Sequence, residues 1–400
     1  MKEVNQIVEY YKGYKIRLYP TKEQEVLIWK HIGCCRFVWN WMLAKQLELR
    51  KQNGKHLGDF DMINLLKPLK NDSEHEWLYE VSNASLQTVC KDLHESYKMF
   101  FNKKANYPNF KSKRKSSKTF PLRSDTFYFK NSRVVCVQKI GKIKYKTDFT
   151  IPFGTKQKFK NPRISNKNGK WFLSFSMLCE NQARELTKHS IGIDLGVKEL
   201  AVVEFNGQCK VFHNINKSKK MKKLNEKLKY YQRKQSRQYR TNPKNKSDSK
   251  AKGKKWEKSK NIVKTENKIR KIYAKITNIR QNYIHQTTHE LIEMLPYRIV
   301  MEDLKISNMM KNRHLSRVIG EMCWYEFIRQ MKYKCEWNGI EFVQVDKFYP
   351  SSKTCSCCGN IKKDLKLSDR TYICDICGLT IDRDYNAAIN LSKYLGTQST

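Results

Sequence analysis

The stretch Thr371–Leu391, TYICDICGLTIDRDYNAAINL, joins two patterns that together decide the fold. Its first half carries the C-x-x-C pair of Cys374 and Cys377, and fifteen residues separate this pair from an earlier one, Cys355 and Cys358. A C-x-x-C pair is typical of a tight turn, and two such turns at this spacing direct four thiolates at one tetrahedral Zn²⁺. Its second half has an acidic first turn that opens a short amphipathic helix. The sequence therefore predicts a zinc ribbon that runs directly into a helix bearing carboxylates.

Positive charge dominates the composition. The 400 residues hold 80 Lys and Arg against 38 Asp and Glu, a net charge of +42 that is spread along the chain. Such an excess repels itself unless an anionic partner covers it, which favours nucleic acid over a membrane surface. Hydrophobic residues (39%) and aromatic residues (12%) suffice for folded cores and exclude a disordered basic tail. The length favours two or three structural units.

Hydropathy and cysteine usage indicate the compartment. No run of eighteen apolar residues occurs, and Met1 to Tyr10 lack a hydrophobic signal core, so we expect no membrane segment. Most cysteines outside the two pairs lie singly in apolar or strand-like runs, for example Cys90, Cys136 and Cys179, while Cys34-Cys35 and Cys357 are unpaired extras. Scattered single thiols are typical of a reducing compartment. The sequence thus predicts a cytoplasmic protein.

The first half of the chain reads as strands that enclose a helical segment. Residues 12–20 alternate polar and apolar side chains and predict a strand. Thr21 and Gln24 form a capping-box pattern that opens a helical segment reaching residue 105. Residues 106–118 are a basic linker, and the period-two pattern of 119–178 predicts strands of a small β-barrel that includes strand 12–20.

The order of predicted elements changes after the barrel. Two or three antiparallel strands with Asn206-Gly207 as a hairpin turn precede a basic helical hairpin over 216–295. A buried strand over 297–304, a helix around Trp324 and a strand over 341–345 lead to the cysteine pairs. This is the order of an RNase H-like α/β fold: strand, hairpin, strand, helices, acid-bearing strand, helix, strand and acid-bearing helix.

Three carboxylates occupy the positions at which that fold gathers acids. Asp194 interrupts an apolar strand, Glu302 ends another, and Asp384 lies at the start of the last helix. A lone charge in a buried strand is costly unless it is paired or binds metal. A structural ion pair would explain any one of them, so the prediction rests on all three. Three acids so placed can hold two Mg²⁺ ions about 4 Å apart. The neighbours Asp303 and Asp382 are predicted not to be ligands.

These motifs resemble those of the TnpB family, transposon-encoded RNA-guided DNA endonucleases with a RuvC-type nuclease domain. The resemblance is carried by Gly192–Val197 (GIDLGV), Met301–Leu304 (MEDL), Ser351–Gly359 (SSKTCSCCG) and Asp382–Leu391 (DRDYNAAINL). Two N-terminal segments are also similar, Lys15–Thr21 (KIRLYPT) and Asn106–Lys111 (NYPNFK), so the resemblance covers nearly the whole chain. Cys357 departs from the pattern of the first pair and leaves the ligand set untouched.

The resemblance implies a multidomain α+β protein. A β-barrel wedge domain (1–20 and 119–185) would hold an inserted helical recognition domain (21–118). An RNase H-like (RuvC) α/β nuclease domain (186–400) would follow, with the helical hairpin 216–295 inserted in it and the zinc ribbon at 350–380.

The implied function is cleavage of double-stranded DNA next to a short target-adjacent motif, directed by a guide RNA from the transposon end, in the prokaryotic cytoplasm at the nucleoid. Two Mg²⁺ would be held by Asp194, Glu302 and Asp384, and one Zn²⁺ by the four paired cysteines. Asn83 and Gln87, on a helix predicted over 82–101, are candidate readers of the motif because amides suit base edges, although ordinary surface amides explain them equally well. Lys and Arg between 216 and 260 would follow phosphates of the guide–target heteroduplex.

Other interpretations stay open. A miniature type V CRISPR effector resembles TnpB in its nuclease half, but the short N-terminal half favours the transposon protein. A nuclease-inactive RNA-guided DNA-binding repressor would have lost nuclease carboxylates, and all three acids are present here. A transposase acting alone would need a tyrosine nucleophile with a His-hydrophobic-His metal pair, which is not evident. The sequence leaves the oligomeric state, the guide RNA and the motif undetermined.

Overall fold

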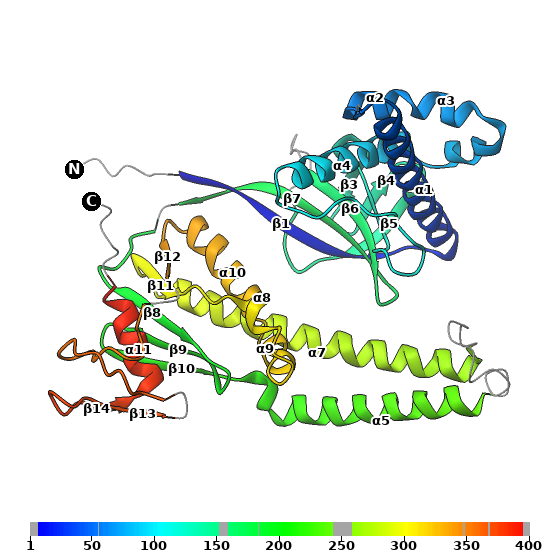
Figure 1. The fold of residues 1–400 in the computed structure, drawn as a ribbon. Helices are drawn as coiled ribbons and strands as arrows, with labels where there is room; N and C mark the ends of the chain where they lie inside the picture. The colour runs from blue at the N-terminus through cyan, green and yellow to red at the C-terminus, as the bar shows by residue number, and fades with distance from the viewer. Residues whose placement is uncertain are drawn as a thin grey trace. The chain divides into compact units, whose positions relative to one another are not determined.

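The computed structural model describes residues 7–54, 56–151, 159–182, 184–242, 258–346, 349–366 and 369–394. The chain divides into two compact units (Figure 1). The N-terminal unit is Tyr10–Cys179, and the C-terminal unit is Glu180–Thr400 together with Met1–Glu9. No helix among the described residues is long and apolar enough to cross a membrane.

A seven-stranded sheet forms the base of the N-terminal unit, in the order β2-β6-β7-β1-β5-β4-β3. Its strands are β1 (Ile7–Tyr19), β2 (Thr119–Pro121), β3 (Phe127–Asn131), β4 (Val134–Val137), β5 (Gly141–Lys146), β6 (Lys160–Lys167) and β7 (Lys170–Gln182). The strand pairs with a described register are antiparallel. The predicted strands are confirmed, but the predicted barrel is not closed within the described residues. Its edge strand β2 has only three residues, and the short turn η2 (Ser124–Thr126) separates it from the other edge, β3.

Helices fill the sequence between β1 and β2 and pack on this sheet in one core (Figure 1). They are α1 (Lys22–Asn53), α2 (Asp59–Asn64), α3 (Leu66–Asn71), η1 (Ser73–Glu80) and α4 (Asn83–Phe101). The predicted capping box is confirmed, because the Thr21 hydroxyl accepts from the Gln24 N–H and the Gln24 side chain accepts from the Thr21 N–H. The described linker 106–118 contains no helix, as predicted.

A five-stranded mixed sheet, in the order β10-β9-β8-β11-β12, forms the centre of the C-terminal unit. Its strands are β8 (Ser190–Leu195), β9 (Glu199–Phe205), β10 (Gln208–His213), β11 (Arg298–Glu302) and β12 (Glu341–Val345). The first three are antiparallel, and Asn206 and Gly207 make their hairpin turn with φ of 51° and 76°, as predicted. β11 is parallel to both β8 and β12.

Helices cover both faces of this sheet (Figure 1). One face carries α7 (Lys260–Glu293), the short α8 (Ile306–Met309), α9 (Ser316–Met322) and α10 (Trp324–Trp337); the other carries α11 (Arg383–Ser392). Ile191 and Ile193 face the first layer because they share its core, whereas Gly192 contacts α11. This alternation along β8 places Asp194 on the same face as Gly192.

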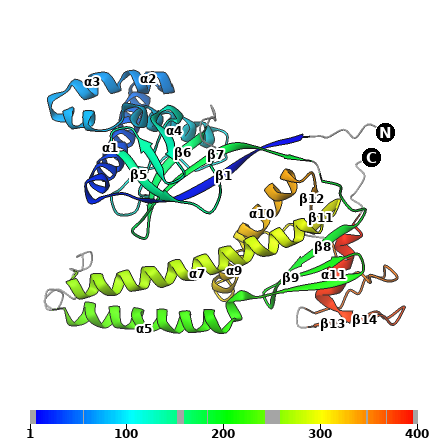
Figure 2. The ribbon, with the colours of Figure 1, turned by 180° about the vertical axis from the view of Figure 1, so that it is seen from behind.

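The predicted helical hairpin is confirmed as α5 (Lys219–Thr241) and α7, which run side by side (Figures 1 and 2). Met221 and Leu228 of α5 pack with Ile269, Ile272 and Ile276 of α7 in a separate small core. The basic stretch 243–257 between the two helices lies outside the described residues.

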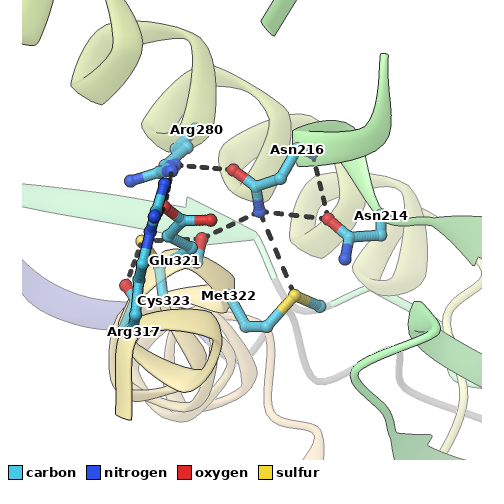
Figure 3. Close-up of polar contacts among 8 residues, drawn as sticks. Asn214, Asn216, Arg280, Arg317, Glu321, Met322 and Cys323 are labelled. Carbon is cyan, nitrogen blue, oxygen red and sulfur yellow. Dashed lines mark hydrogen bonds and ion pairs between the residues drawn. The ribbon is translucent and has the colours of Figure 1, made fainter. Parts of the chain in front are cut away.

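The base of this hairpin is held by a partly buried polar cluster (Figure 3). The Arg280 Nε on α7 donates to Asn216 Oδ1 at 2.7 Å, and Asn216 Nδ2 donates to the Glu321 carbonyl oxygen at 3.0 Å. Asn216 lies in the turn η3 (Ile215–Lys217) between β10 and α5, and Glu321 lies on α9. The cluster therefore ties the start of the hairpin to the segment that follows Glu302.

Candidate functional site

Two predicted acids lie at the ends of neighbouring parallel strands. The register pairs Met301 of β11 with Ile193 of β8, so the next residues along each strand, Glu302 and Asp194, lie beside each other. Parallel strands bring their carboxyl ends to one edge of the sheet, which explains why two distant sequence motifs meet there.

The third acid is brought to this edge by the close packing of α11 on β8. A Cβ built on Gly192 would lie 1.9 Å from the Ala388 carbonyl oxygen and 2.4 Å from the Ser392 nitrogen. Only glycine permits this approach of a helix backbone to a strand. Gly192 lies opposite the second half of α11, and Asp194, two residues further along β8, interacts with Asp384 in the first turn of the helix.

The other two acids act electrostatically on Asp194. Asp194 keeps some exposure to solvent, but its pKa is raised to about 8. The largest cause is burial of its carboxyl group, followed by repulsion from Glu302 and then from Asp384. Like charges gathered on a sheet edge favour the protonated acid unless a cation neutralises them. Carboxylate oxygens are hard ligands of the type that Mg²⁺ prefers.

Two of these carboxylates, those of Asp384 and Glu302, interact with other side chains of the protein. Asp384 Oδ1 accepts from Arg383 Nη2 at 3.0 Å, and Arg370 Nη1 lies 3.8 Å from Asp384 Oδ2. Glu302 Oε1 accepts a hydrogen bond from the Ser351 hydroxyl. Among the described residues, the only group of three or more Cys, His, Asp or Glu side chains whose donor atoms lie within 4.8 Å of one another is the four cysteines. The three acids are thus neighbours without sharing a single ligation sphere.

The neighbouring acids have other roles. Asp382 is the N-cap of α11, since its Oδ1 accepts from the N–H groups of Asp384 and Tyr385 at 3.0 and 3.1 Å. Asp303 forms an ion pair with Lys305. Capping by Asp382 fixes the helix turn that carries Asp384.

The four predicted cysteine ligands come together at the tips of two turns. Cys355 Sγ lies 3.6 Å from Cys377 Sγ, and Cys358 Sγ lies 3.5 Å from Cys374 Sγ. Each turn closes with a glycine of positive φ, Gly359 and Gly378, directly after its second cysteine. Backbone N–H groups of Cys377 and Ile376 lower the pKa of Cys374 to about 6, whereas hydrogen bonds with the other thiols help to raise the pKa of Cys377 to about 12. A tetrahedral all-sulfur set of this size suits Zn²⁺, and Cys357 lies outside it.

We call the segment around these cysteines, residues 349–382, the cysteine ribbon. Among its described residues the strands are β13 (Thr371–Ile373) and β14 (Thr380–Asp382), which pair antiparallel with each other. β14 leads directly into α11, so the ribbon is continuous with the helix that carries Asp384.

The two amides predicted to read the target-adjacent motif lie on α4, in the N-terminal unit. Asn83 Oδ1 accepts from Lys70 Nζ at 3.2 Å, and Gln87 Oε1 accepts from Arg123 Nη1 at 3.1 Å. Gln87 and Arg123 line a cavity of about 450 Å³ that also contains Lys91. Both amide oxygens therefore have protein partners, and only Gln87 lines this basic cavity.

A basic surface lies on α5. Lys229, Arg233, Arg237 and Arg240 line a shallow hollow there. Their spacing of three or four residues places them on one face of the helix, and no ion pair to these four is found in the part of the chain that the structure describes. This face is free to meet an anionic partner.

Sequence reasoning missed the residues that support the acids. These are Ser351, Arg370 and Arg383, together with Asn386 and Asn390 of α11. The spacing of the two asparagines, four apart within an otherwise apolar helix face, was the available signal, because buried amides at one face need partners.

Three family models match the chain. They are described as "Helix-turn-helix domain" (residues 10–55), "Probable transposase" (174–313) and "Cas12f1-like, TNB domain" (324–391). Residues 10–55, matched by the helix-turn-helix model, form the strand β1 followed by one long helix, α1, in this structure.

Curated relatives match over nearly the full length. "Putative RNA-guided DNA endonuclease InsQ" of Escherichia coli (strain K12) is 30% identical over 396 residues, covering 95% of this chain and 91% of the relative. "Putative RNA-guided DNA endonuclease" of Streptomyces pristinaespiralis is 29% identical over 383 residues, covering 95% and 88%. A solved Cas12f1–sgRNA–target DNA complex has 15% identity and a TM-score of 0.37 over 96% of this chain and 99% of that one, a likeness too distant to transfer structural detail.

Proposed function

Since the chain belongs to the TnpB family, we propose that it is an RNA-guided endonuclease that cleaves double-stranded DNA next to a short target-adjacent motif. A guide RNA derived from the transposon end selects the target. The net charge of +42 supports both polyanionic partners.

The observation that carries the proposal is the meeting of Asp194, Glu302 and Asp384 at one edge of the five-stranded sheet. They come from β8, β11 and α11, and burial, followed by repulsion from Glu302 and Asp384, raises the pKa of Asp194 to about 8. A protein keeps such a cost where function requires it, and phosphodiester hydrolysis by bound divalent cations is the chemistry that three such acids serve.

In this mechanism Asp194, Glu302 and Asp384 would hold two Mg²⁺ ions, which would supply Lewis acidity and charge neutralisation at the scissile phosphate. Asp194 would lie between the other two ligands, because it adjoins Glu302 across the strand pair and interacts with Asp384 on the first turn of α11. The guanidinium groups of Arg383 and Arg370 hold Asp384, and the Asp382 cap keeps the first turn of α11 in place.

The four cysteines hold one structural Zn²⁺ in this proposal. All four ligand positions are filled by protein thiolates, which leaves no open coordination position for chemistry. The supporting geometry is the paired turns around Cys355, Cys358, Cys374 and Cys377.

The domain roles follow from the order of the elements. We assign the open seven-stranded sheet to a wedge domain (1–20 and 119–185) and the helices of 21–118 to a recognition domain inserted in it. Residues 186–400 form a RuvC-type nuclease domain, with the hairpin 216–295 inserted in it and a zinc ribbon at 350–380. The position of α1 to α4 between two strands of one sheet supports the insertion.

Two alternatives make different predictions. A nuclease-inactive RNA-guided repressor would not need the three acids, and their gathering at one sheet edge argues against it. A miniature type V CRISPR effector would use the same nuclease site, so a guide transcribed from a repeat array in place of the transposon end would favour it.

The test is a parallel assay of binding and cleavage by the protein with its copurified RNA. Wild type should cleave matching duplex DNA in Mg²⁺ and not in chelator, whereas Asp194→Ala should bind the same DNA and lose cleavage by several orders of magnitude. Undiminished cleavage by this variant, or specific cleavage by RNA-free protein, would refute the proposal.

A further inference from the structure

We propose that Ser351 is a positioning residue for Glu302, and that through it the cysteine ribbon sets the geometry of the carboxylate site. This inference rests on the proposed function, because it concerns the ligand role of Glu302. It adds a residue outside the three acids and gives the ribbon a direct part in the nuclease site.

The first step is the contact itself. The Ser351 hydroxyl donates a hydrogen bond to Glu302 Oε1, and Ser351 is only 1% exposed. A hydroxyl has a single proton to donate. Because its acceptor is a carboxylate, the bond is charge-assisted and stronger than one between neutral groups. It therefore restrains the rotation of the Glu302 carboxylate at the end of β11.

The second step is that Ser351 is itself held by α11. The Asn390 amide donates to the carbonyl oxygens of Ser351 and Thr354, each at 2.7 Å, and the Asn386 amide donates to the Thr354 carbonyl at 2.7 Å. The Ser356 N–H in turn donates to Asn386 Oδ1 at 3.0 Å. Asn386 and Asn390 are four residues apart on a helix, so they act from one face.

The third step is that α11 thereby positions all three acids. Asp384 lies on its first turn, Asp194 follows the Gly192 that contacts its backbone, and Glu302 is held through Ser351. A displacement of the loop 351–356 relative to α11 would move Glu302 away from the other two acids while leaving β8 and β11 paired.

The fourth step connects the loop to the cysteines. Cys355 follows Thr354 directly, and two backbone hydrogen bonds fix it in the turn. Its N–H donates to the Asn360 carbonyl oxygen at 2.8 Å, and its carbonyl oxygen accepts from the Gly359 N–H at 2.9 Å. A metal bound by the four cysteines would link Cys355 to the three other ligands, since all four Sγ atoms lie within 4.8 Å of one another. Loss of the metal would remove this link and loosen the loop that carries Ser351.

Ser352 provides a matched control. It is the same residue type, it is adjacent in the chain, and it is partly exposed whereas Ser351 is buried. Residues that orient metal ligands change metal affinity or activity by about 10- to 100-fold when removed, and a surface hydroxyl does not.

The experiment uses the full-length protein with its guide RNA and compares wild type, Ser351→Ala, Ser351→Thr, Ser352→Ala and Asp194→Asn. Four quantities are measured: zinc per chain, affinity for target DNA, Mn²⁺ binding by electron paramagnetic resonance, and single-turnover cleavage as a function of Mg²⁺ concentration. We expect Ser351→Ala to keep its zinc and its DNA affinity, to bind Mn²⁺ about tenfold or more weakly, and to need correspondingly more Mg²⁺. Ser351→Thr should recover part of this loss, and Ser352→Ala should match wild type.

The outcomes separate this inference from the proposed function. Wild-type Mn²⁺ affinity and Mg²⁺ dependence in Ser351→Ala would overturn the positioning role. Loss of zinc or of DNA affinity in Ser351→Ala would overturn it too, since Ser351 would then support the fold alone. Should Asp194→Asn cleave like wild type, the proposed nuclease site itself would be wrong, whatever the serine variants do.

Discussion

Gly192 on β8 lies against the backbone of Ala388 on α11, so closely that a Cβ on Gly192 would be 1.9 Å from the Ala388 carbonyl oxygen. Backbone atoms on both sides leave no flexible side chain that could yield. Gly192→Ala should therefore displace α11, destabilise the C-terminal unit by about 1–3 kcal/mol or more, and abolish most cleavage because Asp384 moves with the helix. Thermal unfolding and single-turnover cleavage measure the two effects.

Gly320 on α9 is the control for this substitution. The nearest atom to a Cβ there is the flexible Met310 side chain at 3.5 Å, an ordinary contact. Gly320→Ala should leave the melting temperature within about a degree of wild type or raise it, since alanine favours a helix. Wild-type stability in Gly192→Ala would show that α11 does not pack on β8 as described.

The cysteine ligands can be tested by metal content. Cys358→Ser should lose zinc because it removes one of four ligands, whereas Cys357→Ser, one position away and outside the group, should keep one zinc per chain. Elemental analysis of the purified variants, with and without a strong chelator, measures this directly. Equal loss of zinc in both variants would refute the ligand assignment.

Asp382 caps α11, so two substitutions there separate capping from ligation. Asp382→Asn can still accept the N–H groups of Asp384 and Tyr385 and should retain cleavage. Asp382→Ala removes the cap, costs about 1 kcal/mol, and should reduce cleavage because the first turn of α11 frays. The cleavage rate and the free energy of unfolding of each variant are measured. A loss of cleavage in Asp382→Asn equal to that in Asp384→Asn would make Asp382 a ligand.

Patterns that are local in sequence predicted much of the structure. The apolar run around Asp194 predicted the strand β8, and Asn206-Gly207 predicted the turn between β9 and β10, because both signals lie in neighbouring residues. The C-x-x-C turns decided the cysteine group in the same way, because each turn is closed by its own glycine and backbone hydrogen bonds.

Features that depend on distant residues could not be predicted. Closure of the β-barrel depends on the length of the edge strand β2, which periodicity does not determine. The bond between Ser351 and Glu302 joins residues 49 positions apart. The partners of Asn83 and Gln87, Lys70 and Arg123, depend on how α4 packs, so the sequence did not indicate these two hydrogen bonds.

The polar cluster at the base of the helical hairpin offers a comparison of two arginines that approach one acid (Figure 3). Arg280 Nη2 lies 3.7 Å from Glu321 Oε1 and its side chain is 17% exposed, while Arg317 Nε lies 3.3 Å from the same oxygen and is 71% exposed. Buried polar networks lose far more than exposed ion pairs when one member is removed. Arg280→Ala should lower stability by about 1–3 kcal/mol and Arg317→Ala by less than about 0.5 kcal/mol, measured by chemical unfolding. Equal effects would show that the cluster does not hold the hairpin.

The basic face of α5 should bind phosphates of the nucleic acid partners, and salt dependence tests this. Arg233 and Arg237 lie on one helix face without an ion pair among the described residues, so each is free to replace counterions on a phosphate. Removing one such contact should weaken binding and lower the slope of log affinity against log salt by roughly 0.7–0.9. Arg329→Ala is the control, because Arg329 is already paired with Glu326 at 2.7 Å and should leave the slope unchanged. Filter binding of guide RNA between about 50 and 200 mM salt measures the slopes; a wild-type slope in the Arg233→Ala, Arg237→Ala double variant would place the nucleic acid elsewhere on the protein.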